Sequence, residues 1–573
     1  MNVVGISAFF HESACCLLQD GRLVAAAEEE RFSRIKHDPR LPVSAFRYCL
    51  EAGGIGITEI DAVAYYESPV RKLARQLWSG VPVGDADPAR PERAIREGLG
   101  YEGPVLVFGH HASHAASSFL FSGFPEAAVF TVDGVGEWDT TTYGRGLEVF
   151  ERVEFPHSLG LLYSTITSYL GFEVNDGEYK VMGLAPYGRP RYADRIRTLV
   201  SSGSGGQFQL DLRYFDFVRG SRMYSEALCG LFGAPPRPRE SEITSFHQDV
   251  AQSLQIVLEE ILLEKVRWLH GQTGSRRLCM AGGVALNSVA NGRILREGPF
   301  ERLFVQPAAG DSGGCLGAAA LAHLELTGQP PSERMRHAYL GPSWTADEVG
   351  AILSSTGLTF LDFREKETEL LEAVVDRLAA GKVVGWFQGR MELGPRALGA
   401  RSLLADPRDP EMRDRLNGLV KKREAFRPFA PSILQAHARE HLDLDHPSPF
   451  MLETCRVTSK LPLPAVTHVD GSARPQTVDP ETAPRYASLL EAFHRRTGCP
   501  VLVNTSFNVR GEPIVCSPVD ALLCFAGTGI DALVLEDFVI DREALPDNLP
   551  ELLQSWRRPR SGFAVSRELY TFV

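Results

Sequence analysis

Two stretches of the chain repeat the same pattern of short strands and tight turns. Residues 2–30 begin with the apolar run "NVVGIS" and continue as "SACCLLQDGRLVAAAEEE", where Asp20-Gly21 provides the positive backbone angles of a hairpin turn. Residues 127–155, "AAVFTVDGVGEWDTTTYGRGLEVFERVEF", again predict a strand, a glycine-bearing turn around Asp133 and two further strands. Helical material follows each meander, so the sequence predicts a duplicated α/β unit.

Actin-like ATPases are built from such a duplicated unit, and we expect that architecture in the first part of the chain. At 573 residues the chain is too long for one ordinary domain. Its character changes after "LGPSWTADEVGAILSSTGLTFLDF", a helical connector. Residues 390–427 carry ten Lys or Arg against six Asp or Glu, although the whole chain is acidic. We therefore predict two α/β domains, residues 1–345 and 346–573.

Composition narrows the classes of function. A net charge of -12 argues against general binding to nucleic acid or to an anionic membrane, since both require a basic surface. Ten cysteines form no C-x-x-C pair, so a reducing cytoplasm is the simplest setting. We see no signal peptide and no apolar run long enough to cross a membrane.

The stretch "FGHHASHAASSF" contains a possible metal site. His110 and His114 are four residues apart, so on a helix they project from the same face. Asp133 and Asp311 lie in glycine-bearing turns and are further candidate ligands, and this donor set suits iron, zinc or manganese. His111 points elsewhere and is expected not to be a ligand. The alternative is a pair of buried core histidines without a metal.

Two glycine-rich junctions predict phosphate binding in the first domain. Gly282-Gly283 and Gly313-Gly314 each join a predicted strand to a helix. Such turns present backbone N–H groups where the helix dipole favours anions, so a nucleotide is the expected ligand. Ordinary close packing of a strand on a helix is the competing explanation.

The second domain is predicted to bind a phosphorylated small molecule. Guanidinium groups match phosphate oxygens, and a buried strand that ends in polar residues is a usual ligand position in α/β folds. A solvated basic face is the alternative. The candidate residues are Arg390, Arg396, Arg401, Lys421, Lys422, Arg423, Arg427, Asn504, Thr505, Ser506, Asn508 and Arg510.

Several long motifs resemble the O-carbamoyltransferases of the nodulation-protein and antibiotic-biosynthesis type. They occur in the family's order over nearly the whole chain: "FHESACCLLQDGRLVAAAEEERFSRIKH", "HHASHAASSF", "GEYKVMGLAPYG", "GGVALN", "GRMELGPRALGARS", "FRPFAPS", "DGSARPQTV" and "NTSFNVRGEPIV". The resemblance implies an N-terminal Kae1-like domain with the actin-like fold and a C-terminal YrdC-like α/β domain. It also implies that ATP and carbamoyl phosphate form carbamoyl-adenylate, from which the carbamoyl group passes to an acceptor hydroxyl.

The resemblance assigns residues to these roles. His11 would deprotonate the acceptor hydroxyl. The metal ligands would be His110, His114, Asp133 and Asp311, with Fe²⁺ as the metal and Zn²⁺ or Mn²⁺ as alternatives. Nucleotide, with Mg²⁺, would contact Gly282, Gly283, Asn287, Gly313 and Gly314. Carbamoyl phosphate would lie among Arg396, Lys421 and Arg427, and the ATP or adenylate would be held by Arg474, Asn504, Thr505, Ser506 and Arg510.

Other functions remain in view at this stage. An actin-like phosphotransferase would need neither the His-x-x-x-His pattern nor the basic cluster of the second domain. Threonylcarbamoyl transfer to tRNA shares the chemistry, but the net charge of -12 opposes a nucleic-acid acceptor. A non-catalytic nucleotide-binding scaffold would tolerate loss of His11 and the metal ligands. The resemblance leaves the small-molecule acceptor open, with a natural-product hydroxyl preferred, and a homodimer is the default oligomer.

Overall fold

The computed structural model of the chain describes residues 1–80, 87–421 and 426–546 and divides into two compact units. The first unit contains Met1–Glu29 and His37–Met335. The second contains the described residues from 336 to 546 and, in addition, the short segment Glu30–Lys36. In the sequence this segment follows a strand of the first unit, but its contacts place it in the second unit.

The first sheet of the first unit has five strands in the order β3-β2-β1-β4-β5. Strands β1, β2 and β3 form an antiparallel meander, and β4 and β5 extend it in parallel. Asp20 and Gly21, at the turn between β2 and β3, have φ angles of 48° and 76°, as the predicted hairpin requires. The strands are β1 (Asn2–Ser7), β2 (Ala14–Gln19), β3 (Arg22–Glu28), β4 (Ala62–Tyr65) and β5 (Val105–Val107).

The second sheet repeats this topology strand for strand. Its order is β12-β11-β6-β7-β8, with an antiparallel meander β6-β7-β8 and two parallel strands, β11 and β12, beside β6. The predicted duplicated, actin-like α/β unit is thereby confirmed. The strands are β6 (Ala128–Val132), β7 (Asp139–Arg145), β8 (Glu148–Glu154), β11 (Arg277–Ala281) and β12 (Arg302–Val305).

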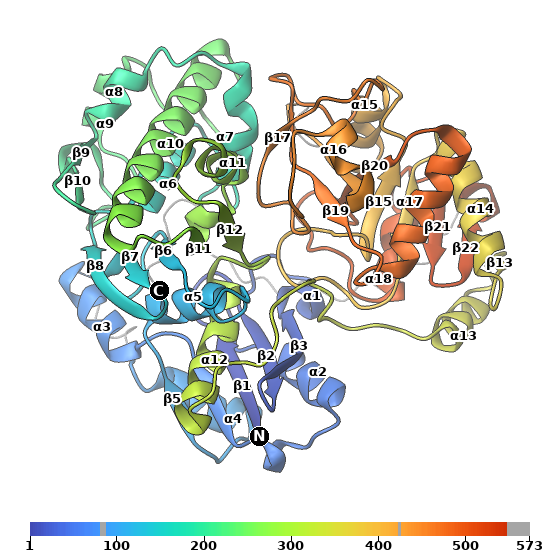
Figure 1. Cartoon of the computed structure of the whole chain (residues 1–573), viewed down its shortest axis with the longest axis horizontal. Coiled ribbons are helices and arrows are strands. Elements are labelled where there is room, and N and C mark those ends of the chain that lie inside the picture. Colours follow the sequence, from blue (N-terminus) through green and yellow to red (C-terminus); the bar gives the residue numbers. More distant parts are fainter. Residues whose placement is uncertain (81–86, 422–425, 547–573) are drawn as a thin grey trace. The chain divides into compact units, whose positions relative to one another are not determined.

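Two helices each pack on the sheet other than the one they follow in the sequence. Helix α5 (His110–Phe119) follows the last strand of the first sheet but packs on β6 and β11 of the second. Helix α12 (Gly314–Thr327) follows the last strand of the second sheet but packs on β1 and β2 of the first. The two helices lie against each other (Figure 1), and a side chain at Gly317 of α12 would collide with the backbone carbonyl of Ser113. Small residues therefore permit the close approach that brings both helix starts together.

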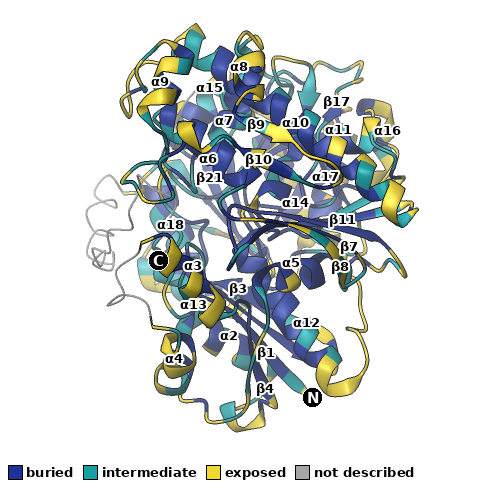
Figure 2. Cartoon of the chain, turned by 90° about the vertical axis from the view of Figure 1, so that its left-hand side faces the viewer, coloured by how far each residue is buried: buried dark blue, intermediate teal, exposed yellow. Residues whose placement is uncertain are grey.

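The remaining helices of the first unit cover its two sheets. They are α2 (Val43–Gly53), α3 (Pro69–Trp78), α4 (Arg90–Leu99), α6 (Leu159–Tyr169), α7 (Glu178–Leu184), α8 (Ala193–Arg197), α9 (Glu226–Phe232), α10 (Ser245–Thr273) and α11 (Ser288–Glu297), and a small ribbon pairs β9 (Val200–Ser202) with β10 (Phe208–Leu210). Strands β1 and β11 and helix α5 are almost entirely buried, as their dark blue colour in Figure 2 shows.

The second unit is built on an eight-stranded mixed sheet in the order β13-β22-β21-β14-β15-β20-β16-β19, with a separate ribbon of β17 and β18. Trp386, Leu403 and Leu502 are among the fully buried side chains of its core. The strands are β13 (Leu361–Asp362), β14 (Val384–Phe387), β15 (Arg401–Ala405), β16 (Ala430–Leu434), β17 (Cys455–Arg456), β18 (Ser472–Ala473), β19 (Gln476–Val478), β20 (Val501–Ser506), β21 (Ala532–Leu535) and β22 (Phe538–Asp541). This sheet and its helices confirm the α/β fold class expected for the second part of the chain, and the predicted boundary at residue 345 stays a prediction.

Two helices of the second unit begin at capping residues that the sequence carries in recognisable form. Ser517 accepts the N–H of Asp520 at the start of α18, with Pro518 at the first helical position. Thr345 does the same for Glu348 at the start of α13. The helices are α1 (Glu30–Ser33), α13 (Ala346–Thr356), α14 (Glu367–Ala379), α15 (Met412–Leu416), α16 (Ala438–His441), α17 (Pro484–Thr497) and α18 (Pro518–Ala526).

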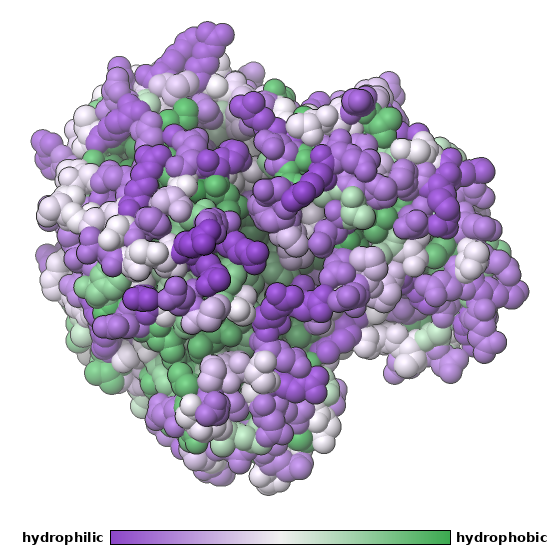
Figure 3. All heavy atoms as spheres, viewed as in Figure 1, coloured by the Kyte–Doolittle hydropathy of each residue, from purple (hydrophilic) through white to green (hydrophobic). Residues whose placement is uncertain are grey.

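The outer surface matches the charged composition of the chain. Hydrophilic side chains cover most of the face drawn in Figure 3, and apolar ones are scattered among them. Within the described ranges, every helix is too short or too polar to cross a bilayer.

Candidate metal centre and donor site

The candidate metal centre is built from equivalent positions of the duplicated unit. His11 lies in the loop after β1, and Asp133 directly follows β6, the matching strand of the second sheet. His110 is the first residue of α5, after β5, and Asp311 begins the short turn (Asp311–Gly313) that leads into α12, after β12. The four side chains therefore follow two pairs of equivalent strands, β1 with β6 and β5 with β12, in the two halves of the duplicated unit.

Four of the predicted ligands converge on one buried point. Donor atoms of His110, His114, Asp133 and Asp311 all lie within 4.8 Å of one another. His110 Nε2 is 3.0 Å from both Asp133 Oδ2 and His114 Nε2, and 3.5 Å from Asp311 Oδ1. His114 Nε2 is 3.4 Å from Asp311 Oδ1. All four side chains are at most 2% exposed.

The donor set fits a transition metal. Both carboxylate oxygens of Asp311 are buried, and neither has a hydrogen-bond partner among the described residues. Buried oxygens of this kind are normally satisfied, so two imidazoles and two carboxylates around one point form a candidate cation site. Nitrogen and oxygen donors in this combination are appropriate for iron, zinc or manganese.

Electrostatic interactions within the cluster shift the pKa values of His110 and Asp133. Burial opposes protonation of His110, but the carboxylates of Asp311 and Asp133 outweigh it and raise the pKa of His110 to about 9. Burial likewise opposes ionisation of Asp133, yet its hydrogen bonds to His110 and His114 hold the pKa of this carboxyl well below its ordinary value. The cluster therefore favours positive charge beside Asp133.

His111 faces away from the cluster. Its Nδ1 lies 2.6 Å from the Thr131 hydroxyl, and it does not belong to the convergent group of four. Burial, followed by repulsion from His110 and His114, lowers the pKa of His111 well below its ordinary value. His111 is therefore a neutral residue of the core next to the cluster.

His11 stands at the edge of the same centre. Its Nε2 lies 3.6 Å from Asp311 Oδ2, and its side chain is 15% exposed, unlike the four members of the cluster. The loop that carries it is shaped by Phe9, which has φ 67° and whose carbonyl accepts a hydrogen bond from Lys72 Nζ at 3.3 Å. A bulky residue in the left-handed region needs such support.

The glycines expected near a nucleotide have clear local reasons to be glycines. Gly282 has φ 94°, and the N–H of Gly283 donates to Asp133 Oδ1 at 2.8 Å. A Cβ at Gly314 would lie 2.5 Å from the ring of Tyr66, and Gly313 is equally crowded. Asn287 caps α11 by accepting the N–H of Ala290. Gly283 thus orients an Asp133 oxygen, and a nucleotide contact at these residues stays a prediction.

In the second unit, strand register gathers the predicted donor-binding residues at one end of the sheet. Strand β20 is antiparallel to β15 and β16, with Ser506 opposite Ser402 and Asn504 opposite Ala430. The carboxyl end of β20 therefore meets the amino ends of β15 and β16, and β19 is parallel to β16. The residues that lead into or out of this end are Arg396, Arg427, Arg474, Asn504, Thr505, Ser506 and Arg510.

The guanidinium of Arg401 is enclosed by backbone carbonyls at this end of the sheet. Arg401 is 0% exposed, and its guanidinium donates to the carbonyls of Gln388, Gly389, Ala400 and Pro342 while lying over the ring of Phe387. Arg390 donates in the same way to the carbonyls of Leu340 and Gly341. The side chain of Lys421, together with Lys422 and Arg423, lies outside the described residues.

Asn504 is buried beneath the loop that carries Arg396. Its amide donates to Ser432 Oγ at 3.0 Å and Gln476 Oε1 at 2.9 Å, and Gln476 in turn donates to the Leu398 carbonyl at 2.6 Å. Asn504 is 1% exposed, so these hydrogen bonds support the loop from below. Ser506, two residues further along β20, is only partly buried.

Two buried glutamates organise the site loops and were not predicted from the sequence. Glu137 Oε1 accepts the N–H groups of His110 and Ser68 at 2.9 and 2.7 Å. Glu392 Oε1 accepts those of Leu398 and Ala400, both at 2.7 Å, across the loop of Arg396. A glutamate inside a glycine-rich motif is the only sequence signal either residue offers.

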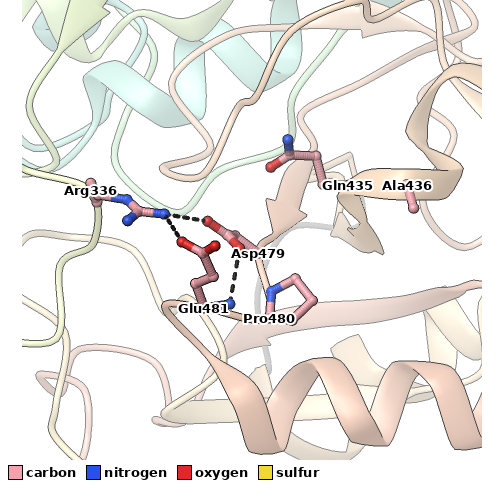
Figure 4. Close-up of a pocket in the computed structure, with 6 residues that line it drawn as sticks. All are labelled: Arg336, Gln435, Ala436, Asp479, Pro480 and Glu481. Carbon is pink, nitrogen blue, oxygen red and sulfur yellow. Dashed lines mark hydrogen bonds and ion pairs between the residues drawn. The ribbon is translucent and has the colours of Figure 1, made fainter.

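A surface pocket of about 440 Å³ lies at the opposite end of the same sheet. Gln435 follows β16 and Asp479 follows β19, so the pocket is at the carboxyl ends of these parallel strands (Figure 4). Arg336 there pairs with Asp479 and Glu481 at 3.1 and 2.6 Å. Its charge is already balanced, so the pocket is not suited to a phosphate.

The fold and the site together describe a duplicated α/β unit with a buried candidate metal centre, and a second α/β unit with candidate ligand-binding residues at one end of its sheet. Residues 2–77 and 98–320 match the family described as carbamoyltransferase N-terminus, and residues 375–542 match carbamoyltransferase C-terminus. The chain belongs to the carbamoyltransferase family, and it is a transferase.

Relatives of nearly full length support this assignment. Nodulation protein NolNO of Sinorhizobium fredii is 39% identical over 96% of this chain and 82% of its own length. Nodulation protein NolO of Bradyrhizobium diazoefficiens is 41% identical over 80% of this chain and 84% of its own. An uncharacterized protein of Synechocystis sp. is 43% identical over 97% of this chain and 99% of its own length.

Solved structures are only distantly similar. HypF of T. kodakarensis matches with a TM-score of 0.31 and 13% identity, over 57% of this chain and 48% of its own. The ROK hexokinase of Thermus thermophilus matches with a TM-score of 0.28 and 18% identity, over 57% of this chain and 100% of its own.

Proposed function

We propose that the protein is an ATP-dependent O-carbamoyltransferase that forms carbamoyl-adenylate from carbamoyl phosphate and passes the carbamoyl group to a hydroxyl of a natural product. The observation that carries this proposal is His11 at 3.6 Å from Asp311, beside the four convergent ligands. A proton acceptor next to a cation site is the arrangement that attack by a hydroxyl requires.

Donor activation is assigned to residues 346–573. Carbamoyl phosphate and ATP are both polyanions, and Arg396, Arg427 and Arg474 approach the same end of the sheet to offset their repulsion. By mass balance, each carbamoyl-adenylate formed consumes one water and releases one phosphate and one pyrophosphate. The phosphate comes from carbamoyl phosphate, and the pyrophosphate leaves when a carbamate oxygen bonds to the α-phosphorus of ATP.

Carbamoyl transfer is assigned to residues 1–345. The acceptor oxygen attacks the carbamoyl carbon, AMP leaves with the electron pair of the broken C–O bond, and His11 takes the hydroxyl proton. The Asp311 carboxylate lies close enough to stabilise the protonated His11 ring. A metal held by His110, His114, Asp133 and Asp311, with Fe²⁺ preferred, would supply Lewis acidity toward the carbamoyl carbonyl.

The acceptor is assigned to the class of antibiotic, polyketide or sugar hydroxyls, in a cytoplasmic reaction. The nodulation and antibiotic-biosynthesis enzymes that the motifs resemble act on acceptors of this kind. A phosphotransferase is disfavoured because it has no use for a buried two-histidine, two-carboxylate cluster at the helix starts. A non-catalytic scaffold is disfavoured because it needs neither this cluster nor a partly exposed histidine beside it.

Product stoichiometry tests the proposal. Purified protein is incubated with Mg²⁺-ATP, carbamoyl phosphate and a panel of amino sugars and polyketide alcohols, and phosphate, pyrophosphate, AMP and carbamoylated product are quantified. We expect pyrophosphate only when both donors are present, and equal amounts of AMP and carbamoylated alcohol. Carbamoyl transfer at full rate without ATP, or formation of ADP instead of pyrophosphate, would contradict it.

A further inference from the structure

The segment Glu30–Lys36 reaches into two loops of the second unit. It is the direct continuation of β3, yet it belongs to the second unit by its contacts. Arg31 and Arg34, on and just after the short helix α1, provide the hydrogen bonds. The two loops they contact are the ones on either side of the proposed donor site.

Arg31 holds the loop that carries Arg396. Its side chain is 3% exposed, and its Nη2 donates to the Gly394 carbonyl at 2.7 Å. Gly394 has φ 99°, a conformation that other residues rarely adopt, and it lies two residues before Arg396. Glu392 ties the opposite side of the loop through the N–H groups of Leu398 and Ala400. Arg396 therefore sits on a loop fixed from both sides.

Arg34 holds the loop that follows β20. Its two Nη atoms donate to the consecutive carbonyls of Ile514 and Pro513 at 2.6 and 2.8 Å, and its Nε lies 3.5 Å from Asp520 Oδ1. The planar fork of arginine spans two neighbouring carbonyls, which lysine cannot do. Arg34 itself has φ 59°, and a residue keeps this uncommon conformation only where its contacts impose it.

The second loop is fixed at several points around the same contact. Asp520 Oδ2 accepts the N–H groups of Ser517 and Cys516, and the Val515 N–H donates to the Phe507 carbonyl at 2.9 Å. Arg510 lies within this folded stretch, and Ser506, the last residue of β20, directly precedes it. The shape of the loop, and with it the position of Arg510, depends on the carbonyls that Arg34 holds.

We propose that Arg31 and Arg34 are positioning residues for donor activation, with Arg31 placing the carbamoyl-phosphate loop and Arg34 placing the nucleotide loop. This inference rests on the proposed function. On this inference, the geometry of the donor site in the second unit depends on the segment Glu30–Lys36, which follows β3 in the sequence. Positioned groups lose effectiveness steeply when displaced by about 1 Å, so small shifts of either loop have kinetic consequences.

The test uses the full chain with Arg31→Ala, Arg31→Lys, Arg34→Ala and Arg34→Lys. Pyrophosphate release is measured as a function of ATP at saturating carbamoyl phosphate, and the reverse. We expect Arg31 variants to raise the KM for carbamoyl phosphate about tenfold more than the KM for ATP, and Arg34 variants to do the opposite. Bound metal per protein should stay at the wild-type ratio in all four.

Arg22→Ala is the matched control. Arg22 lies on β3, and its ion pair with Glu333 joins two exposed side chains, so its loss should leave both KM values unchanged. If an alanine variant does not fold, the lysine variants decide, because they keep the charge and lose the fork. Equal shifts of both KM values, or wild-type values in the lysine variants, overturn the inference. Absence of pyrophosphate release in the wild type would instead refute the proposed function.

Discussion

Glu137 Oε1 accepts the backbone N–H of His110 at 2.9 Å, and so joins the turn after β6 to the first residue of the histidine helix. The same oxygen accepts the N–H of Ser68 at 2.7 Å, where α3 begins. Since Asp133 lies on the turn and His110 on the helix, one buried carboxylate links two predicted metal ligands that follow strands of different sheets.

Loss of this carboxylate should weaken metal binding. In Glu137→Ala two buried N–H groups have no acceptor, the start of α5 moves, and metal affinity should fall at least about tenfold. Glu137→Gln keeps an acceptor oxygen and should retain most of the metal. The measurement is metal per protein after dialysis against a graded chelator series, with the exposed Glu148→Ala as control. Wild-type retention in Glu137→Ala would show that α5 is placed by packing alone.

Removing both imidazoles should abolish specific metal binding. His110→Ala combined with His114→Ala leaves only Asp133 and Asp311 at the cluster, and two carboxylates alone do not form a strong transition-metal site. The matched control is His111→Asn on the same helix, because the His111 ring pairs with the Thr131 hydroxyl and does not belong to the four convergent donors. Elemental analysis should find metal in the control and none in the double variant. If the double variant retained metal, the metal would be bound at other residues.

His11→Ala should separate the two half-reactions. Its ring lies beside Asp311 and outside the second unit, so pyrophosphate release should continue while transfer falls about 100-fold or more. Both products are measured in the same reaction, by pyrophosphate assay and by mass spectrometry of the acceptor. A parallel decline of the two would assign His11 a role in folding or in donor binding.

The fold was accessible from sequence where its signals are local. Asp20-Gly21 predicts the first hairpin, and the strand–turn–strand pattern around Asp133 predicts the second, because turn chemistry and alternation act within a few residues. His110 and His114 could be paired from their spacing on one helix. Asp133 and Asp311 could be named as candidate partners from their glycine-bearing turns. Their meeting with the histidines is a tertiary feature, because the three strand ends involved converge only after both sheets form.

Contacts between side chains and distant backbone groups could not be predicted in this way. Arg401 lies in a basic motif and was a candidate for phosphate, yet four carbonyls and the Phe387 ring enclose it. Glu137 accepts backbone N–H groups, and Arg34 donates to backbone carbonyls. Nearly every residue of a chain carries both groups. No spacing rule identifies such partners, so only the folded chain reveals them.

Glu536 should make the stability of the protein fall as pH rises toward neutrality. Glu536 Oε1 accepts the Gly389 N–H at 2.7 Å, the side chain is 8% exposed, and burial raises its pKa from 4.5 to about 7. The folded state therefore keeps a proton that the unfolded state has already lost between pH 4.5 and 7, so stability decreases across this range and levels off above it. The total change is at most about 3 kcal/mol.

Glu536→Gln removes the titration and keeps an acceptor for the Gly389 N–H. Its unfolding temperature should therefore decline less than that of the wild type between pH 5 and pH 8, with the two curves furthest apart at the alkaline end. Glu543→Gln is the control, because Glu543 is mostly exposed and its pKa is lowered, chiefly by a backbone hydrogen bond. Parallel curves for Glu536→Gln and wild type would mean that Glu536 is already ionised in the folded protein, with Arg485, 3.8 Å away, compensating its burial.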